Sequence, residues 1–434
     1  MPDQKIAAGK SFCGGFSCAA GACPFTCCMQ WIISVDPETL RKWEEIPVSS
    51  LTAACGENSF SPQAVPDQYG TADGRAERPP ASLAEIGTVP DPQSGNSRIR
   101  PGGNGECPFL LKSRLCGVQT AFGAGCIPRT CRIFPRIVYD YPERTEFSLS
   151  ACCPEVLKTL SGMETGFPGL LSDFETPEVP DFLWQVRRQI LLVIADETVP
   201  TGLALLTAAY ILLDIRDRAV KETGYGAANA VPGAAGEWFG RYENPAFLAE
   251  LRNAAAGAAP DPEESLQENL ELFLDLTKNY SEAGMYADEL EPVRKKAERL
   301  ADSRDRRREY INNNVTKGGP RRRGTGTEVP ASESRLLRGL VLAECVSQLA
   351  SPDTDLRDLM LTFEWIVMEF SLGRLLLILW DNAAGEKAGP EETIILLTAA
   401  ARVMGFSEDD IEEYMESAFS EPVWEWGYYD LLIG

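Results

Sequence analysis

Thirteen cysteines are the side chains of this 434-residue chain whose type and spacing best support chemistry, and twelve of them precede residue 154. The densest run, across residues 13–28, reads C-x4-C-x4-C-x3-C-C. Sulfur is the ligand that soft metals and iron–sulfur clusters prefer, and four thiolates complete a cubane cluster. One or two cysteines often pack as small hydrophobes, but this density favours a metal or cluster site.

The cysteine spacings differ from those of several familiar thiol sites. No C-x2-C occurs, which counts against zinc ribbons, RING-like sites, thioredoxin-type motifs and bacterial ferredoxins. The C-x3-C-x2-C signature of radical S-adenosylmethionine enzymes is also absent, because Gln30 stands where its third cysteine would be. In the vicinal pairs Cys27-Cys28 and Cys152-Cys153, adjacent side chains tend to point apart, so each pair suits different irons or different sites better than one zinc ion.

Composition excludes further classes of function. The chain has no histidine, which removes Ser-His-Asp and Cys-His catalysis, histidine-ligated zinc and any imidazole base. With 41 Lys and Arg against 64 Asp and Glu, its formal charge is −23. Because general nucleic-acid binding needs a basic footprint, we expect no nucleic-acid partner.

The hydrophobic stretches indicate a protein without a membrane partner. The N-terminus lacks a run of signal-peptide type, and the apolar stretches at 202–215 and 372–380 are shorter than the ~18–20 residues that a bilayer span requires. We therefore expect a cytoplasmic protein whose thiols stay reduced, where clustered cysteines usually serve metals or catalysis. The sequence does not fix the oligomeric state.

The residue patterns predict a mostly α fold: a cysteine-rich N-terminal metal- or cluster-binding region with short strands or a hairpin, then an irregular α-helical bundle. Asp36 followed by Pro37 is typical of a helix start. Residues 31–35 fit a short buried strand or the lead-in to that helix. Alternating β-branched and aromatic residues at 132–150 predict a hairpin. Beyond residue 180, apolar residues recur at steps of three and four, as in amphipathic helices.

The predicted domain limits follow from composition. Residues 1–54 and 106–180 form the cysteine-rich region, and the Gly- and Pro-rich residues 55–105 form a flexible insertion with at best a weak hairpin near its end. Residues 181–434 form the helical domain, with flexible loops near 222–240 and 311–333.

Two features outside these motifs have ordinary explanations. The basic run at 294–323 is interpreted as a solvated helix face and loop, although it also suits an acidic partner or a phosphate-bearing ligand. Cys345 stands alone within a predicted helix, so we expect it to be a core residue.

Three ordered blocks carry a family resemblance. They are FSCAAGACPFTCCMQWIISVD at 16–36, CPFLLKSRLCGVQTAFGAGCIPRTCRIFPRIV at 107–138 and SLSACCPE at 148–155. Over residues 16–155 the chain resembles the flagellin lysine-N-methylases, whose first block reads aromatic-x-C-x4-C-x3-CC-x2-W-x-(I/V)-x-x-D. The helical remainder resembles that family only in character.

The resemblance implies methyl transfer from S-adenosyl-L-methionine to lysine ε-amino groups of flagellin, with a [4Fe-4S] cluster held by the cysteines. On that basis the candidate metal ligands are Cys18, Cys23, Cys27, Cys28, Cys107, Cys116, Cys131 and Cys153. Eight thiols exceed the four that one cubane needs, so two metal sites, or one cluster plus structural or redox thiols, both stay open. The cysteines additional to the family pattern are Cys13, Cys55, Cys126 and Cys152.

Four further residues that match the family blocks have both a structural and a functional interpretation. Trp31 suits a core position and Asp36 a helix cap. Arg132 and Arg136 match the second block, and Arg136 also suits an anionic cluster or the donor's carboxylate. A neutral lysine must attack the sulfonium methyl, and without histidine the proton acceptor is a carboxylate, a tyrosine, a backbone carbonyl or water.

The nearest proton acceptors by sequence are Tyr139, Asp140 and Tyr141. Catalytic and donor-binding residues stay unassigned, since no glycine motif of a Rossmann methyltransferase is present. Two alternatives remain: an iron–sulfur or zinc-binding protein on the same cysteine scaffold without methyltransferase activity, and a zinc-stapled module whose helices dock a partner.

Overall fold

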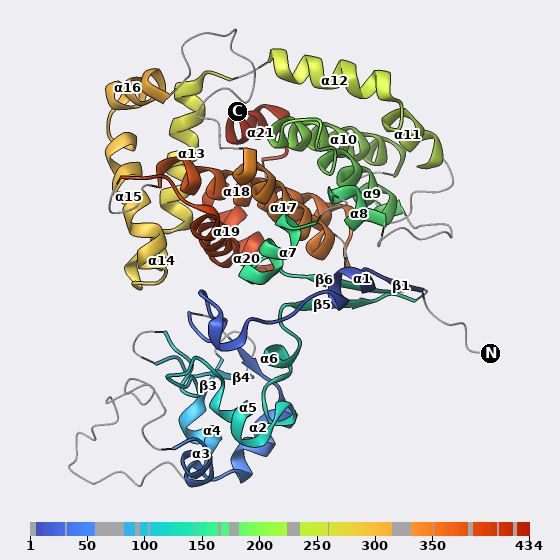
Figure 1. Cartoon of the computed structure of the whole chain (residues 1–434). Helices are drawn as coiled ribbons and strands as arrows, with labels where there is room; N and C mark the ends of the chain where they lie inside the picture. Colours follow the sequence, from blue (N-terminus) through green and yellow to red (C-terminus); the bar gives the residue numbers. More distant parts are fainter. Residues whose placement is uncertain are drawn as a thin grey trace. The chain divides into compact units, whose positions relative to one another are not determined.

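The computed structural model describes residues 6–30, 33–56, 82–91, 96–102, 105–142, 144–163, 166–172, 182–223, 235–258, 260–314, 331–349, 351–380, 385–405, 408–419 and 423–434. The chain divides into two compact units (Figure 1). The cysteine unit is Ser17–Pro135, and the helical unit joins Met1–Phe16 to Arg136–Gly434. Residues 136–172, which the sequence analysis places in the cysteine-rich region, pack with the helical unit.

The described residues of the cysteine unit include short helices and strands. Its helices are α2 (Pro37–Glu45), α3 (Val48–Cys55), α4 (Leu83–Gly87), α5 (Gly117–Phe122) and α6 (Arg129–Ile133), with 3-10 turns at Ala20–Ala22 and Ala124–Cys126. Its strands β2 (Ser34–Val35), β3 (Thr88–Pro90) and β4 (Ser97–Ile99) form an antiparallel sheet in the order β2-β4-β3. The short buried strand predicted at 31–35 is therefore present in its described part.

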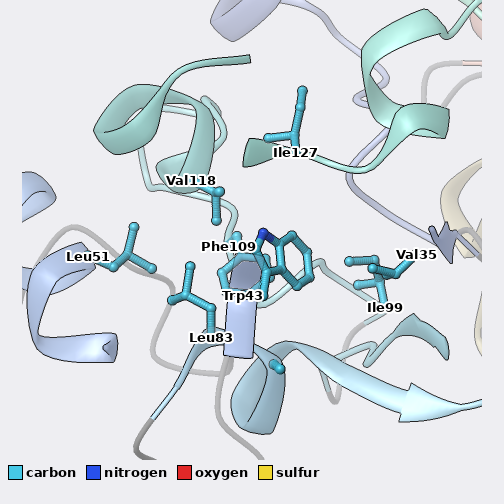
Figure 2. Close-up of a cluster of buried hydrophobic side chains, with 9 residues drawn as sticks. Val35, Trp43, Leu51, Leu83, Ile99, Phe109, Val118 and Ile127 are labelled. Atoms are coloured by element: carbon cyan, nitrogen blue, oxygen red, sulfur yellow. The ribbon is translucent and has the colours of Figure 1, made fainter. Parts of the chain in front are cut away.

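The core of the cysteine unit is built around Trp43 of α2 (Figure 2). The Phe109 ring meets the Trp43 ring edge-on, with the ring centroids 4.8 Å apart. The Trp43 indole N–H donates to the carbonyl of Cys126 at 2.6 Å. Buried aromatic pairs of this kind add about 0.5–1.5 kcal/mol beyond the area they bury. Four cysteines pack against this core: Cys55, Cys107, Cys116 and Cys126.

The described residues at the end of the predicted insertion form regular elements. Residues 57–81 and 92–95 lie outside the described residues, but α4 begins with a full capping box between Ser82 and Glu85. Leu83 and Ile99 are buried in the Trp43 core. The hairpin expected near the end of this segment is confirmed as β3 and β4. Long-range burial of a few apolar side chains orders a stretch whose composition alone reads as loop.

In its described part, the helical unit includes a three-stranded sheet. Strands β5 (Arg136–Asp140) and β6 (Arg144–Leu149) form the predicted hairpin, with Val138 opposite Phe147. Strand β1 (Ile6–Ala8) runs parallel to β6, giving the order β1-β6-β5, and α1 (Lys10–Gly14) follows it. The guanidinium of Arg136 lies 5.1 Å from the centroid of the Phe16 ring, where cation–π attraction adds to packing.

The rest of the helical unit confirms the predicted irregular bundle. Its helices are α7 (Pro154–Ser161), α8 (Gly166–Ser172), α9 (Phe182–Ile194), α10 (Thr201–Thr223), α11 (Ala235–Tyr242), α12 (Pro245–Gly257), α13 (Pro262–Leu276), α14 (Lys278–Glu282), α15 (Ala287–Ala301), α16 (Arg304–Asn314), α17 (Ala331–Gln348), α18 (Leu356–Leu379), α19 (Pro390–Met404), α20 (Glu408–Phe419) and α21 (Trp426–Ile433). Most of the loops predicted near 222–240 and 311–333 lie outside the described residues.

Helix α18 forms the centre of this bundle (Figure 1). Twenty of its residues are buried, which is the pattern of a helix surrounded by others. Asp355 caps its start in a capping box with Asp358. Cys345 is fully buried in α17, so its predicted role as a core residue is confirmed. In the described residues no helix is long and apolar enough to span a bilayer.

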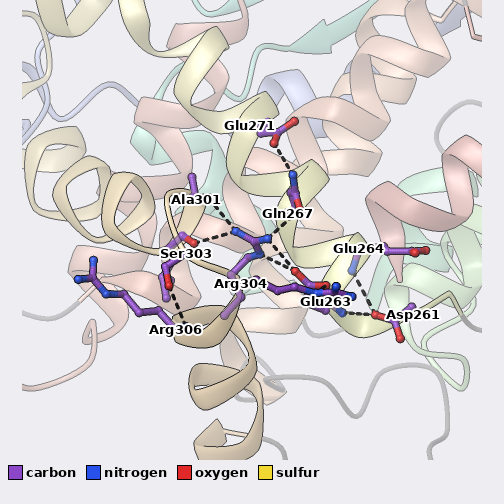
Figure 3. Close-up of polar contacts among 11 residues, drawn as sticks. Asp261, Glu263, Glu264, Gln267, Glu271, Ala301, Ser303, Arg304 and Arg306 are labelled. Atoms are coloured by element: carbon purple, nitrogen blue, oxygen red, sulfur yellow. Dashed lines mark hydrogen bonds and ion pairs between the residues drawn. The ribbon is translucent and has the colours of Figure 1, made fainter.

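Part of the basic run forms ion pairs that connect helices α13 and α16 (Figure 3). Arg304 and Arg307 both bind the carboxylate of Glu263, at 2.9 and 2.7 Å. Arg307 is buried and also donates to Gln267 at 2.8 Å. Since Glu263 lies in the first turn of α13, its charge also suits the helix dipole. These two arginines are therefore structural, and residues 315–323 of the run lie outside the described residues.

Candidate functional site

Seven of the eight predicted ligand cysteines belong to the cysteine unit, and Cys153 belongs to the helical unit. The exposed thiols are Cys18, Cys27 and Cys131, the half-buried ones are Cys23, Cys28, Cys107 and Cys116, and Cys153 is buried.

The first cysteine loop is fixed against the segment that carries Cys116. The backbone N–H of Ala20 donates to the Cys18 sulfur at 3.3 Å, and the chain turns there through a 3-10 turn. A Cβ on Gly21 would lie 2.7 Å from the carbonyl oxygen of Ser113, so only glycine allows this approach. Arg114 donates to the carbonyl of Pro24 at 3.2 Å. The small residues of the loop therefore serve close backbone packing.

Backbone pairing brings the first and second cysteine blocks together. The N–H of Cys107 donates to the carbonyl of Cys28 at 2.8 Å, and Met29 and Glu106 form an antiparallel bridge. Cys116 lies opposite Leu110 in a second antiparallel bridge, which returns the chain toward Cys107. Cysteines almost 80 residues apart in sequence thus become neighbours through ordinary main-chain hydrogen bonds.

Five thiols of the cysteine unit lie within electrostatic range of one another, and we call them the thiol group: Cys27, Cys28, Cys107, Cys116 and Cys131. A hydrogen bond with the Cys27 thiol, burial and the charges of neighbouring thiols raise the pKa of Cys28 far above its ordinary value. Burial and the charges of Cys116 and Cys27 raise the pKa of Cys131 to about 12. The structure therefore gathers five of the eight predicted ligands, and Cys18 and Cys23 lie on the loop that leads into them.

Backbone N–H groups influence the pKa values of two of these thiols. Burial raises the pKa of Cys116, and the nearby backbone N–H groups of Gln119 and Val118 oppose that rise. The N–H of Phe109 acts on Cys107 in the same way. Cys116 is the N-cap residue of α5, whose first-turn N–H groups act on its sulfur electrostatically without forming a cap hydrogen bond. Donors of this kind stabilise thiolates and tune sulfur-bound metal centres.

The thiol group brings sulfur atoms into one region, but their described positions do not form a metal-coordination geometry. Within the described ranges, no three Cys, Asp or Glu side chains stand in an arrangement that could hold a metal ion. Each cysteine has alternative staggered rotamers that redirect its sulfur while the backbone stays in place. The donor chemistry and the N–H groups fit a soft metal or a cluster, whereas the described rotamers do not yet form its cage.

Asp36 has a structural role that serves the site. It caps α2 by accepting from the Thr39 N–H at 3.0 Å, as predicted, and it also accepts from the Arg129 N–H at 2.8 Å. Burial by itself would raise the pKa of Asp36, but these hydrogen bonds outweigh it and lower the pKa to about 2. Because Arg129 begins α6, Asp36 fixes the helix that carries Cys131.

Other residues singled out by sequence are placed in ordinary contacts. Arg136 stacks on Phe16 in the helical unit, and Arg132 is exposed on α6. Asp140 accepts from the Thr145 hydroxyl at 3.0 Å. Tyr141 is buried beneath the Arg144 guanidinium, and burial raises its pKa to about 12. Trp31 lies outside the described residues.

Sequence reasoning missed the residues that hold the Cys152-Cys153 loop. Glu344 of α17 accepts from the Ala151 N–H at 3.2 Å, and Arg402 of α19 donates to the Cys152 carbonyl at 3.1 Å. Burial raises the pKa of Glu344. A glutamate that is fully buried inside a helical bundle is itself unusual. These partners are about 190 and 250 residues away in sequence, and an isolated charged residue in a helical pattern gives no signal of such a contact.

Comparison with known proteins supports part of the resemblance. Over 146 residues, 34% of this chain, it is 28% identical to the flagellar biosynthetic protein FliU of Salmonella muenchen, covering 71% of that protein. Over the same length it is 27% identical to the lysine-N-methylases of Salmonella typhimurium and Salmonella choleraesuis. The match covers only 30% of each of those two proteins. No protein-family model and no solved structure matches this chain.

Proposed function

We propose that this protein transfers a methyl group from S-adenosyl-L-methionine to lysine ε-amino groups of flagellin, with a [4Fe-4S] cluster bound by its cysteines. The observation that carries the proposal is the similarity to the two lysine-N-methylases over 146 residues. The name of the third relative, a flagellar biosynthetic protein, supports a flagellar substrate.

The thiol group supports the metal part of the proposal. Cys27, Cys28, Cys107, Cys116 and Cys131 would supply the ligands, which leaves one thiol beyond the four that a cubane takes. The N–H groups of the α5 turn would bond to the ligand sulfurs and so stabilise their anionic form. When bound, the cluster would supply a redox-active or Lewis-acidic centre. Zinc is the alternative metal for the same donors.

The chemistry of the reaction defines what the chain must do. The lysine nitrogen attacks the sulfonium methyl carbon, a C–N bond forms as the S–C bond breaks, and S-adenosylhomocysteine leaves. The nitrogen lone pair is available only after the ammonium has lost a proton, so the site must hold the lysine beside an acceptor. In a chain without histidine, a carboxylate, a tyrosine, a backbone carbonyl or water takes that proton. Tyr141 is poorly suited to this role, because it is buried beneath an arginine.

Co-expression of the full chain with a flagellin tests the proposal. Flagellin lysines, mapped by peptide mass spectrometry, should gain single-methyl mass increments only when the chain is present. Anaerobically isolated protein should be brown and contain iron and sulfide in equal amounts. If flagellin stays unmodified while cluster and donor are both confirmed present, the proposed methyltransferase activity is contradicted.

A metal-binding protein without transferase activity is the second candidate. It is favoured by the 30% coverage of the lysine-N-methylases, since most of their length has no counterpart in the match. In that case the isolated protein contains iron and sulfide, or zinc alone, while flagellin lysines stay unmodified.

A further inference from the structure

Cys55 is placed at the edge of the thiol group by the helix that carries it. It is the last residue of α3, where Gly56 ends the helix with a φ of 87°. Leu51, one turn earlier on the same face, is buried in the Trp43 core. Because Leu51 fixes the rotation of α3, the Cys55 side chain also faces inward, and it packs against the same core.

The Cys55 sulfur reaches the residue that follows Cys116. Its thiol donates to the carbonyl oxygen of Gly117 at 3.5 Å, across 62 residues of sequence. The Cys55 side chain also contributes to raising the pKa of Cys116, so the two side chains lie within electrostatic range. Helices α3 and α5 pack together, which gives this proximity a rigid basis. A sixth thiol therefore lies beside the five of the thiol group.

We propose that Cys55 is a soft-metal ligand that acts beside Cys116. The inference rests on the metal-binding part of the proposed function and extends it to a cysteine that neither the family resemblance nor the first cysteine block includes. The half-buried thiol is a neutral donor to a carbonyl in the absence of metal. On binding a soft divalent ion it loses its proton to solvent, and the thiolate turns from the Gly117 carbonyl toward the ion.

Ligand number gives a physical reason for a sixth thiol. One tetrahedral thiolate centre uses four sulfurs, so a group of five leaves one over. Addition of Cys55 brings the number to six, which is enough for two tetrahedral ions that share bridging thiolates. With Cys55 as a sixth ligand, the fifth thiol of the group would also have a role, as part of a two-ion thiolate site.

Cadmium titration of the full, reduced chain tests this inference, because thiolate–cadmium charge-transfer absorption reports the number of bound sulfurs. Cys55→Ser should lower the plateau of that absorption and weaken cadmium binding by about tenfold or more. Cys126→Ser is the matched control: Cys126 packs against the same core and is equally half-buried. That variant should behave as the wild type does. Serine can still donate to the Gly117 carbonyl, so α3 should keep its position.

A second measurement avoids any loss of folding in the variant. In the wild type, alkylation of each cysteine is followed by peptide mass spectrometry with and without cadmium. Cys55 should be protected at the same cadmium concentration as Cys116. If Cys55 stays reactive while Cys116 is protected, or if Cys55→Ser matches Cys126→Ser in the titration, Cys55 is not a ligand and the inference is overturned. Flagellin methylation and iron content, measured separately, would leave the proposed function standing in that case.

Discussion

The carboxylate of Glu364 accepts a hydrogen bond from the backbone N–H of Val423 at 3.1 Å in the centre of the helical unit. Glu364 lies on α18 and is fully buried. Burial raises its pKa to about 7, although the Val423 N–H opposes that rise. The carboxyl group therefore holds a proton in the folded chain at a pH where the unfolded chain has lost it.

This raised pKa makes the stability of the helical unit depend on pH. A carboxyl group whose folded pKa lies above its unfolded value contributes full stability below the unfolded pKa, near 4.3, and loses it as pH rises through about 7. From pH 5 to pH 8 we expect the free energy of unfolding to fall by roughly 3 kcal/mol from Glu364 alone. Burial raises the pKa values of Glu344 and Glu369 too, so both add to the trend.

Glu364→Gln tests that dependence. The neutral amide keeps an oxygen for the Val423 N–H, and the fall in thermal stability between pH 5 and pH 8, followed by far-ultraviolet circular dichroism, should become shallower. Glu412→Gln is the control, because Glu412 is a half-exposed partner of Arg357 at 2.7 Å. Equal slopes in the wild type and the Glu364 variant would contradict the prediction.

Loss of Asp36 should loosen both helices that it joins. In Asp36→Ala, α2 loses its cap and α6 loses the hydrogen bond at Arg129, at a cost of about 1–3 kcal/mol. The pKa of Asp36 is lowered, so its contribution is present above about pH 4 and is lost as pH falls toward 2. Hydrogen exchange should rise in peptides from both helices. Glu38→Ala, which removes only an exposed pair with Lys42, should leave exchange in α6 unchanged.

Gly87→Ala should disturb the Trp43 core. A Cβ at this position would lie 2.2 Å from the Phe109 ring, and overpacking of a core costs about 1–3 kcal/mol. Gly125→Ala is the matched control, because a Cβ there meets nothing within 4 Å. Tryptophan fluorescence and protease resistance of the cysteine unit should fall only in the first variant. Equal behaviour of the two variants would show that the Phe109 ring can shift without a loss of stability.

The two kinds of cysteine should differ in their effect on metal content. Cys28→Ser removes a member of the thiol group, and we expect iron and sulfide in the anaerobically isolated protein to be lost. Cys345→Ala truncates a fully buried core thiol and should leave the metal content nearly unchanged while lowering thermal stability. Full iron content in the Cys28 variant would show that the first cysteine block was wrongly assigned.

Local features of the fold were readable from the sequence. The Asp36-Pro37 pair gave a helix start because a cap needs only its own next three residues. The hairpin of β5 and β6 and the long helices likewise depend on periodicity within a short window. The cysteine density indicated a thiol-based site before any contact was known.

Long-range relationships were not readable in the same way. The parallel pairing of β1 with β6 joins Ile6 to Arg144, and no local pattern specifies such a partner. The folding of Leu83 onto Trp43 depends on tertiary burial that overrides a loop-like composition. The contact from Cys55 to Gly117 depends on how α3 and α5 pack. These features arise from surfaces that meet only after the chain has collapsed.

The stacking of Arg136 on Phe16 has a consequence for how this chain is assembled. The 119 residues of the cysteine unit leave the helical unit at Phe16 and return at Arg136, two positions already in contact. An insert whose two attachment residues lie in contact can be gained, lost or exchanged as a module while its host keeps the same sheet. A short glycine bridge between those two positions should therefore leave a truncated host that still folds on its own.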